Sequence, residues 1–160
     1  MGIFDRLFKG NSIEVCAPVS GQAVSITKVS DPTFAQEMVG KGIAIEPSEG
    51  KFYAPCDGQL VALFPTGHAF CMLSDDGVEV LVHIGIDTVK LKGEHFTIHA
   101  AQGQAVKKGD LIVEADLEKI KEAGYETITP VIVSNPTKFS NIEKKDGAIA
   151  AGDPVILLNK

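Results

Sequence analysis

The alternation of hydrophobic and polar residues along the chain is typical of short β-strands. Between residues 78 and 84, valine or isoleucine occupies every second position, and His83 lies among the residues of the opposite face. A lone histidine in a strand is usually a packed core residue. Gly85 weakens that interpretation, because glycine lets the backbone approach closely and its carbonyl could hold one ring nitrogen of His83. The other nitrogen would then be free for chemistry.

A hairpin is predicted immediately before this strand. The residues Ser74-Asp75-Asp76-Gly77 are typical of a tight turn, and they separate apolar strands at 69–73 and 78–82. Pairing of these strands would bring His68 close to His83, provided that the register allows it. The sequence therefore suggests a pair of histidines rather than an isolated one.

The chain also contains an internal repeat. The pattern AP-x-x-GQ-x-V begins at Ala17 and again at Ala54, a displacement of 37 residues. A second, shorter repeat consists of an apolar residue followed three positions later by Gly-Asp. It occurs at Val106 with Gly109-Asp110 and at Ile149 with Gly152-Asp153. Two repeats in consistent order predict a duplicated, pseudo-symmetric β architecture.

Helical signals are few. Asp31-Pro32 is a good helix start and is followed by an apolar stripe of Phe34, Met38 and Val39. A later helix is predicted over 117–121, with Asp116 as its cap and a glycine at its end. The remaining pattern predicts an all-β fold, a sandwich or barrel of about a dozen short strands with one or two helical turns.

Composition narrows the function classes. A chain of 160 residues with 44% hydrophobic content is long enough for one well-packed domain. Its net charge of −6 and the lack of a basic cluster argue against nucleic acid as a partner, and no apolar run approaches the roughly 20 residues of a membrane span. Three cysteines without metal-ligand spacing are expected to be reduced thiols in a cytoplasmic protein.

Two regions are expected along the chain. Residues 1–12 are interpreted as a flexible N-terminal segment with an amphipathic stripe, which gives residues 1–10 at most weak contact with a membrane surface or a partner. Residues 13–160 are expected to form a single domain, since nothing between them has the composition of a linker.

Four separated motifs carry a specific resemblance over nearly the whole chain. They are APVSGQAV, DPTFAQEMVGKGIAI, FPTGHAF and VEVLVHIGIDTVKLKG. In this order they resemble the enzyme IIA component of the glucose family of the bacterial phosphoenolpyruvate-dependent sugar phosphotransferase system. The resemblance implies a duplicated antiparallel β-sandwich and a phosphocarrier that takes a phosphoryl group from the carrier HPr and gives it to the IIB domain of a sugar transporter. Permeases or kinases are further partners that it suggests.

The resemblance also assigns the site. It implies that His83 is phosphorylated, that His68 stabilises the phosphoryl group, that Thr66 orients His68 and that the Gly85 carbonyl orients His83. A neutral imidazole is a good nucleophile near pH 7, and phosphoryl transfer needs mainly alignment and charge stabilisation. No cofactor is required for this chemistry.

Partner binding is expected around the histidine pair. Asp31 and Asp87 resemble acidic residues that meet arginines on the partners. An apolar rim that excludes water is expected from Phe34, Val39, Phe64, Phe70 and Leu81. Among the departures from the family pattern, Lys41 stands where an acid is common.

Two other classes remain as alternatives. In a zinc hydrolase of the same fold family, His68, His83 and Asp87 would be ligands, but the H-x-H of such peptidases is absent from the sequence. Zinc held by His68 and His83 with ligands supplied by a partner stays open. A biotinyl or lipoyl carrier would need an exposed lysine at a hairpin tip, and Lys107-Lys108 lacks the expected flanking residues.

Overall fold

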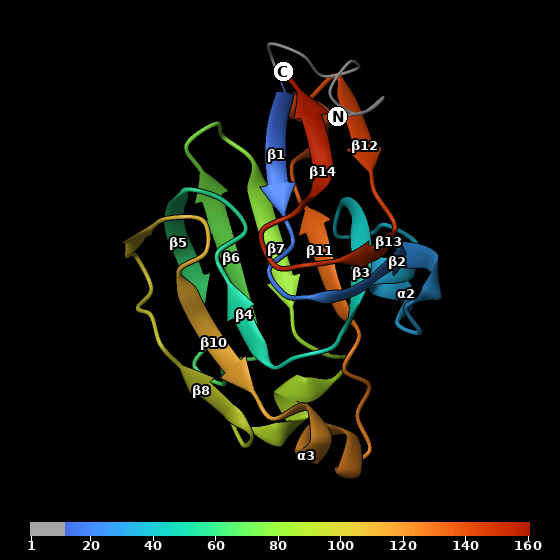
Figure 1. Cartoon of the computed structure of the whole chain (residues 1–160), viewed down its shortest axis with the longest axis vertical. Coiled ribbons are helices and arrows are strands. Elements are labelled where there is room, and N and C mark those ends of the chain that lie inside the picture. Colours follow the sequence, from blue (N-terminus) through green and yellow to red (C-terminus); the bar gives the residue numbers. More distant parts are fainter. Residues whose placement is uncertain (1–11) are drawn as a thin grey trace.

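The computed structural model describes residues 12–160 and consists mainly of short antiparallel strands (Figure 1). The amphipathic segment expected within residues 1–12 lies almost wholly outside the described residues. The strands are β1 (Ser12–Cys16), β2 (Gly21–Ser25), β3 (Lys41–Pro47), β4 (Lys51–Tyr53), β5 (Gly58–Leu63), β6 (Ala69–Ser74), β7 (Glu79–His83), β8 (Phe96–Ile98), β9 (Ala105–Val106), β10 (Leu111–Ala115), β11 (Thr129–Val133), β12 (Asn141–Lys144), β13 (Gly147–Ile149) and β14 (Pro154–Asn159).

The strands form three sheets. The largest has eight strands in the order β13-β2-β3-β11-β7-β6-β5-β9, and two three-stranded sheets have the orders β1-β14-β12 and β4-β10-β8. Every pairing is antiparallel, from β1 with β14 to β6 with β7. β7 lies near the middle of the large sheet, between β11 and β6. The all-β prediction is confirmed.

Short helices connect the strands. They are the α-helices α2 (Pro32–Ala35) and α3 (Leu117–Glu122) and the 3₁₀ helices η1 (Ile26–Lys28), η2 (Thr88–Leu91) and η3 (Pro136–Lys138). The predicted helix start at Asp31-Pro32 and the predicted cap at Asp116 are confirmed, since Asp31 accepts a hydrogen bond from the Thr33 amide and Asp116 accepts one from the Lys119 amide. None of the helices in residues 12–160 has the length and apolar character of a membrane-spanning helix.

The apolar stripe predicted after Asp31 does not lie on one helix face. α2 ends at Ala35, so the stripe is split. Phe34 is buried, whereas Met38 is 71% exposed. The helix is too short to carry the helical spacing as far as Met38, which therefore belongs to the surface.

The repeated AP-x-x-GQ-x-V motif is also a structural repeat. Gly21 opens β2 and Gly58 opens β5. A Cβ atom on Gly21 would lie 2.1 Å from the carbonyl oxygen of Glu46, and one on Gly58 would lie 2.1 Å from that of Leu73. Only glycine allows neighbouring backbones to approach this closely, so both copies need it.

Backbone hydrogen bonds relate the two copies in the same way. Ala17 exchanges two hydrogen bonds with residues 152–153, at 2.9 and 2.8 Å. Ala54 exchanges two with residues 109–110, at 3.0 and 2.8 Å. Each copy of the alanine-proline motif thus binds one copy of the Gly-Asp motif, which confirms the predicted duplication.

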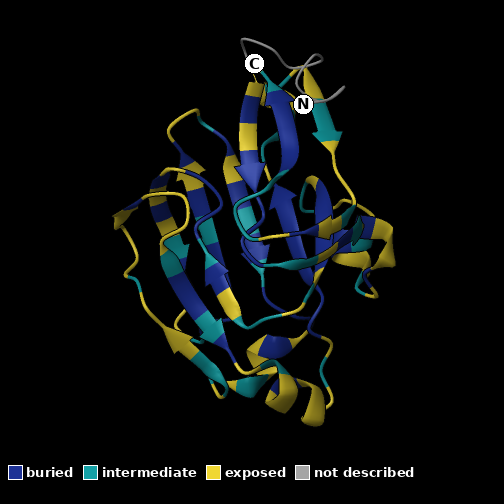
Figure 2. Cartoon of the chain, in the orientation of Figure 1, coloured by how far each residue is buried: buried dark blue, intermediate teal, exposed yellow. Residues whose placement is uncertain are grey.

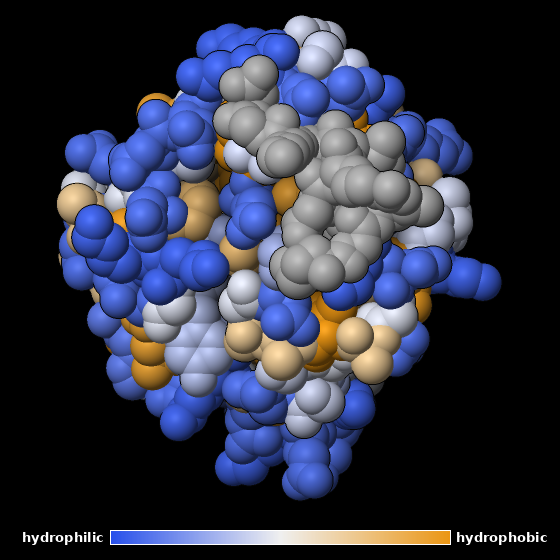
Figure 3. Space-filling view, turned by 45° about the horizontal axis from the view of Figure 1, so that its top comes forward, coloured by the Kyte–Doolittle hydropathy of each residue, from blue (hydrophilic) through white to orange (hydrophobic). Residues whose placement is uncertain are grey.

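The core lies between the sheets. Figure 2 shows β11 buried along its length, whereas α3 is mostly exposed. In β7 the predicted alternation is confirmed, because Val80 and Val82 are buried while Leu81 and His83 keep partial exposure. The face seen in Figure 3 is largely hydrophilic, with its hydrophobic residues in small separate groups. Because Val80 and Val82 of β7 face the core, His83 lies on the outer face of this strand.

Replacing Gly58 by alanine should destabilise the fold strongly, because the new Cβ would collide with a backbone carbonyl that cannot move cheaply. Gly103→Ala is the matched control, since a Cβ there meets nothing within 4 Å and only the left-handed backbone (φ 88°) is strained. In urea unfolding, Gly58→Ala should lose at least about 2 kcal/mol more than the control. Equal losses would contradict the role given to the close approach.

Candidate active site

The β6–β7 hairpin brings two histidines together. Ala69 pairs with His83 in the register of these strands, and the amide of Ile84 donates a hydrogen bond of 2.6 Å to the carbonyl of His68. The imidazole ring centroids lie 5.1 Å apart with an interplanar angle of 81°. The predicted proximity of His68 and His83 is confirmed.

His83 is held in one tautomer by the backbone. Its Nδ1 lies 2.7 Å from the carbonyl oxygen of Gly85. A carbonyl can only accept, so Nδ1 carries the proton and the lone pair is on Nε2. The ring packs against Phe34, with centroids 5.0 Å apart. An oriented imidazole with a free Nε2 is suited to nucleophilic attack.

The Gly85 carbonyl is fixed by its surroundings. Gly85 has φ 78°, and a Cβ there would lie 2.7 Å from the carbonyl oxygen of Glu126. The same Glu126 carbonyl accepts a hydrogen bond of 3.1 Å from the Ile86 amide. The buried hydroxyl of Thr88 donates a hydrogen bond of 2.5 Å to the Ile84 carbonyl. These contacts hold the turn that orients His83, and only glycine fits it.

His68 is the more deeply placed of the two histidines. It is 3% exposed, and its Nδ1 is hydrogen-bonded to the hydroxyl of Thr66. The Phe64 ring meets it edge-on at 5.2 Å between centroids. If the hydroxyl donates, the proton of His68 is on Nε2, where it can be offered to an anion.

Both imidazoles are biased towards the neutral form. Burial lowers the pKa of His68 to about 4, and the neighbouring charge of His83 adds to the effect. Burial also lowers the pKa of His83, against the opposing influence of the Gly85 carbonyl and of the Asp31 and Asp87 carboxylates. At pH 7 the pair therefore offers lone pairs and N–H donors rather than fixed positive charge.

Most of the residues expected around the pair lie there. Asp31 at the start of α2 and the exposed Asp87 after β7 are near enough to act electrostatically on His83. Val39 and Leu81 pack with the cluster that contains Phe34. Phe64 is 42% exposed beside His68.

Phe70 is a correction to the predicted rim. It pairs with Val82 on the inner face of the hairpin, is 0% exposed and belongs to the main core. Its position in β6 points it away from the face that carries His83, because successive side chains of a strand alternate. It cannot contribute to an exposed docking surface.

Several residues at the site were not predicted from the sequence. Glu126 and Thr88 support the Gly85 turn, and Ser30 donates a hydrogen bond of 2.6 Å to the Glu126 carboxylate. Glu126 and Ser30 are 96 positions apart, so no local pattern joins them. Met38 was assigned to a core stripe, although its exposure places it on the surface next to α2.

Comparisons with known proteins identify the family of the chain. Residues 13–139 match the family model described as phosphoenolpyruvate-dependent sugar phosphotransferase system, EIIA 1. The glucose-specific EIIA component of Haemophilus influenzae is 44% identical, with 100% of this chain and 99% of that protein covered. The glucose-specific EIICBA component of Streptococcus pneumoniae is 46% identical over 90% of this chain and 20% of its own length. The structure of glucose permease IIA from Mycoplasma capricolum aligns at TM-score 0.87 and 35% identity, covering 98% of this chain and 99% of that one.

The chain belongs to the EIIA 1 family. It is an EIIA phosphocarrier of the sugar phosphotransferase system, which confirms the resemblance found in the sequence. A zinc hydrolase of the same fold family is therefore not its function.

A metal site in this EIIA chain would have few ligands. Within residues 12–160, no group of three or more histidine, cysteine or acidic side chains is placed to hold a metal ion. His68 and His83 supply two imidazole nitrogens, a donor type that suits zinc, but a four-coordinate site needs two more. The cysteines are free thiols, with Cys16 and Cys56 buried.

The low pKa of His68 predicts a pH dependence. Between about pH 4 and its ordinary value near 6.5, the unfolded chain binds more protons at His68 than the folded chain does. Stability should therefore fall as the pH drops through this window, and His68→Gln should remove on the order of 2 kcal/mol of that fall. Chemical denaturation at each pH, with NMR titration of the imidazole, measures it. A His68 that titrates near pH 6.5 would refute the assignment.

Proposed function

We propose that this EIIA chain accepts a phosphoryl group on Nε2 of His83 from the phosphohistidine of HPr and donates it to the EIIB domain of a glucose-type transporter. The observation that carries the proposal is the hydrogen bond from Nδ1 of His83 to the Gly85 carbonyl. It leaves Nε2 as the only nucleophilic nitrogen of the ring.

The transfer needs no added reactant. The P–N bond of the donor phosphohistidine breaks as the Nε2–P bond to His83 forms, and the proton of His83 stays on Nδ1, where it is donated to the Gly85 carbonyl. The second transfer reverses the roles, with His83 as the leaving group. Because the transition state of phosphoryl transfer is loose, alignment and charge stabilisation supply most of the catalysis.

His68 has the stabilising role in this proposal. The T-shaped arrangement of the two rings, 5.1 Å apart, directs the edge of one imidazole towards the face of the other. With Thr66 donating to Nδ1, Nε2–H of His68 donates to a phosphoryl oxygen. A neutral donor also leaves the phosphoryl group free to depart, whereas a fixed positive charge would hold it.

Partner docking rests on the surface around the pair. Val39, Phe64 and Leu81 supply apolar contact, and exposed Met38 extends it, whereas the buried Phe34 supports the ring of His83 from below. Asp31 and Asp87 supply negative charge for arginines of HPr and of the EIIB domain. Docking would exclude water from the histidines and so limit hydrolysis of the phosphoryl group.

The names of the relatives support glucose as the sugar and EIIB as the acceptor, since one of them joins the three components in a single EIICBA chain. We place the protein in the cytoplasm, where HPr would meet it. Permeases or kinases as regulatory partners use the same docking surface. Zinc is not required for transfer, although a partner that contributes two ligands could complete a site on His68 and His83.

His83→Ala should abolish phosphorylation. Incubated with phosphoenolpyruvate, enzyme I and HPr, the wild-type protein should gain one acid-labile, base-stable phosphate, and the variant should gain none. His99→Ala is the matched control, because His99 pairs with Glu114 at 2.7 Å in another sheet. Normal labelling of His83→Ala, measured by intact mass, would refute the assignment.

His68→Gln should separate the two transfers. The variant keeps the nucleophile, so it should still accept phosphate from HPr, but donation to EIIB should be slower by about 100-fold because a phosphoryl-stabilising donor is misplaced. Quench-flow measurement of each half-reaction tests this. Equal slowing of both steps would count against the role of His68.

A further inference from the structure

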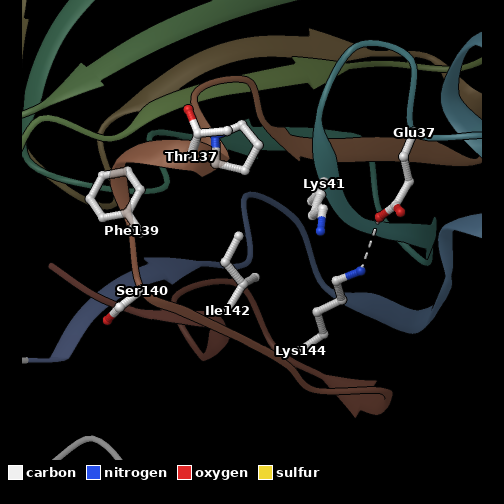
Figure 4. A pocket seen from close by; sticks show the side chains of 8 residues that line it. Glu37, Lys41, Thr137, Phe139, Ser140, Ile142 and Lys144 are labelled. Carbon is white, nitrogen blue, oxygen red and sulfur yellow. Dashed lines mark hydrogen bonds and ion pairs between the residues drawn. The ribbon is translucent and has the colours of Figure 1, made fainter.

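A hollow of about 360 Å³ lies apart from the histidine pair, between the end of α2 and the segment that follows β11 (Figure 4). Its volume is within the range of small-molecule sites. Neither His68 nor His83 lines it. The side chains that carry the argument are Glu37, Lys41, Phe139, Ile142 and Lys144.

One end of the hollow is charged. Nζ of Lys144 lies 3.3 Å from the carboxylate of Glu37, and Figure 4 shows the Lys41 side chain beside this ion pair. Among residues 12–160, no carboxylate lies within ion-pairing distance of Lys41. The two lysines and one glutamate leave a local charge of +1, in a chain whose net charge is −6.

The other end is apolar and firmly held. Phe139 and Ile142 are partly buried and pack against the main core. Ile142 pairs with Leu158 in the β12–β14 ladder, and the Phe139 amide donates to the Pro136 carbonyl. A ligand here would meet a wall already fixed by the fold, so little ordering free energy is spent on binding.

We propose that the hollow binds a small organic monocarboxylate with an aromatic or branched apolar group. The carboxylate would contact Lys41 and Lys144, and the apolar group would lie on Phe139 and Ile142. A monoanion neutralises the local charge of +1, whereas a phosphate dianion would leave excess negative charge beside Glu37. Charge balance therefore favours a carboxylate over a phosphate ester.

The site is adjacent to the machinery of phosphoryl transfer without being part of it. The Glu37 amide donates a hydrogen bond of 3.0 Å to the carbonyl of Phe34, whose ring packs on His83. A ligand carboxylate that replaces Glu37 as the ion-pair partner of Lys144 would release the Glu37 side chain, three residues along the chain from Phe34.

Titration of phenylacetate into the ¹⁵N-labelled full chain tests the proposal. Saturable shifts are expected for the amides of residues 40–41 and 139–144, and Lys41→Met should weaken binding about fivefold, the worth of a partly exposed ion contact. Lys121→Met on α3 is the matched control, because this exposed lysine lies at the far end of the molecule from β12 (Figure 1). Phenyl phosphate should bind more weakly than phenylacetate.

Three outcomes would overturn the proposal. One is equal binding of the neutral phenylacetamide, which would remove the role of the anion. Another is an unchanged affinity in Lys41→Met with its fold intact by circular dichroism. The third is a set of shifts centred on His68 and His83, which would place the ligand at the phosphorylation site.

Discussion

The hydrogen bond between Nδ1 of His83 and the carbonyl of Gly85 is the constraint on which the site depends. It decides which ring nitrogen carries the proton and therefore which one can attack. The bond exists only because the chain turns sharply two residues after His83, with φ 78° at Gly85. The tight approach of the Glu126 carbonyl and the hydroxyl of Thr88 keep that turn from relaxing. Backbone geometry, rather than a second acid or base, sets the chemistry of the imidazole.

The duplicated framework explains why this geometry can be rigid. The Cys16 amide donates to the Pro55 carbonyl at 2.9 Å, and the Tyr53 amide donates to the Pro18 carbonyl at 2.8 Å. Each copy of the motif thus accepts a backbone hydrogen bond from the residue that precedes the other copy. β7 lies near the middle of the large sheet and is hydrogen-bonded to β11 and β6, so His83 is carried by a strand with partners on both sides. A carrier that must present one atom to two different proteins benefits from such a fixed position.

The sequence predicted what depends on local pattern. The hairpin at residues 74–77, the two repeats and the histidine pair all follow from turn residues and strand alternation, and the structure confirms them. The sequence could not predict contacts that are set by tertiary packing. Phe70 looks like a neighbour of His68 in sequence but faces the core, and the support of Gly85 by Glu126 joins segments about 40 residues apart. The apolar spacing after Asp31 does not reveal that α2 ends at Ala35, and Met38 beyond it lies on the surface.

The exposure of the site fits a reaction between macromolecules. His83 keeps partial exposure and Phe64 is 42% exposed beside the buried His68, so a protein partner can reach His83 without entering a cavity. Exclusion of water must then come from docking, and the site is open to solvent between encounters. A small ligand has the opposite requirement, since it gains affinity only where a hollow surrounds it. Neither histidine lines the hollow at Lys41 and Lys144, although Glu37 and Lys41 flank Met38 and Val39 of the docking surface in the chain.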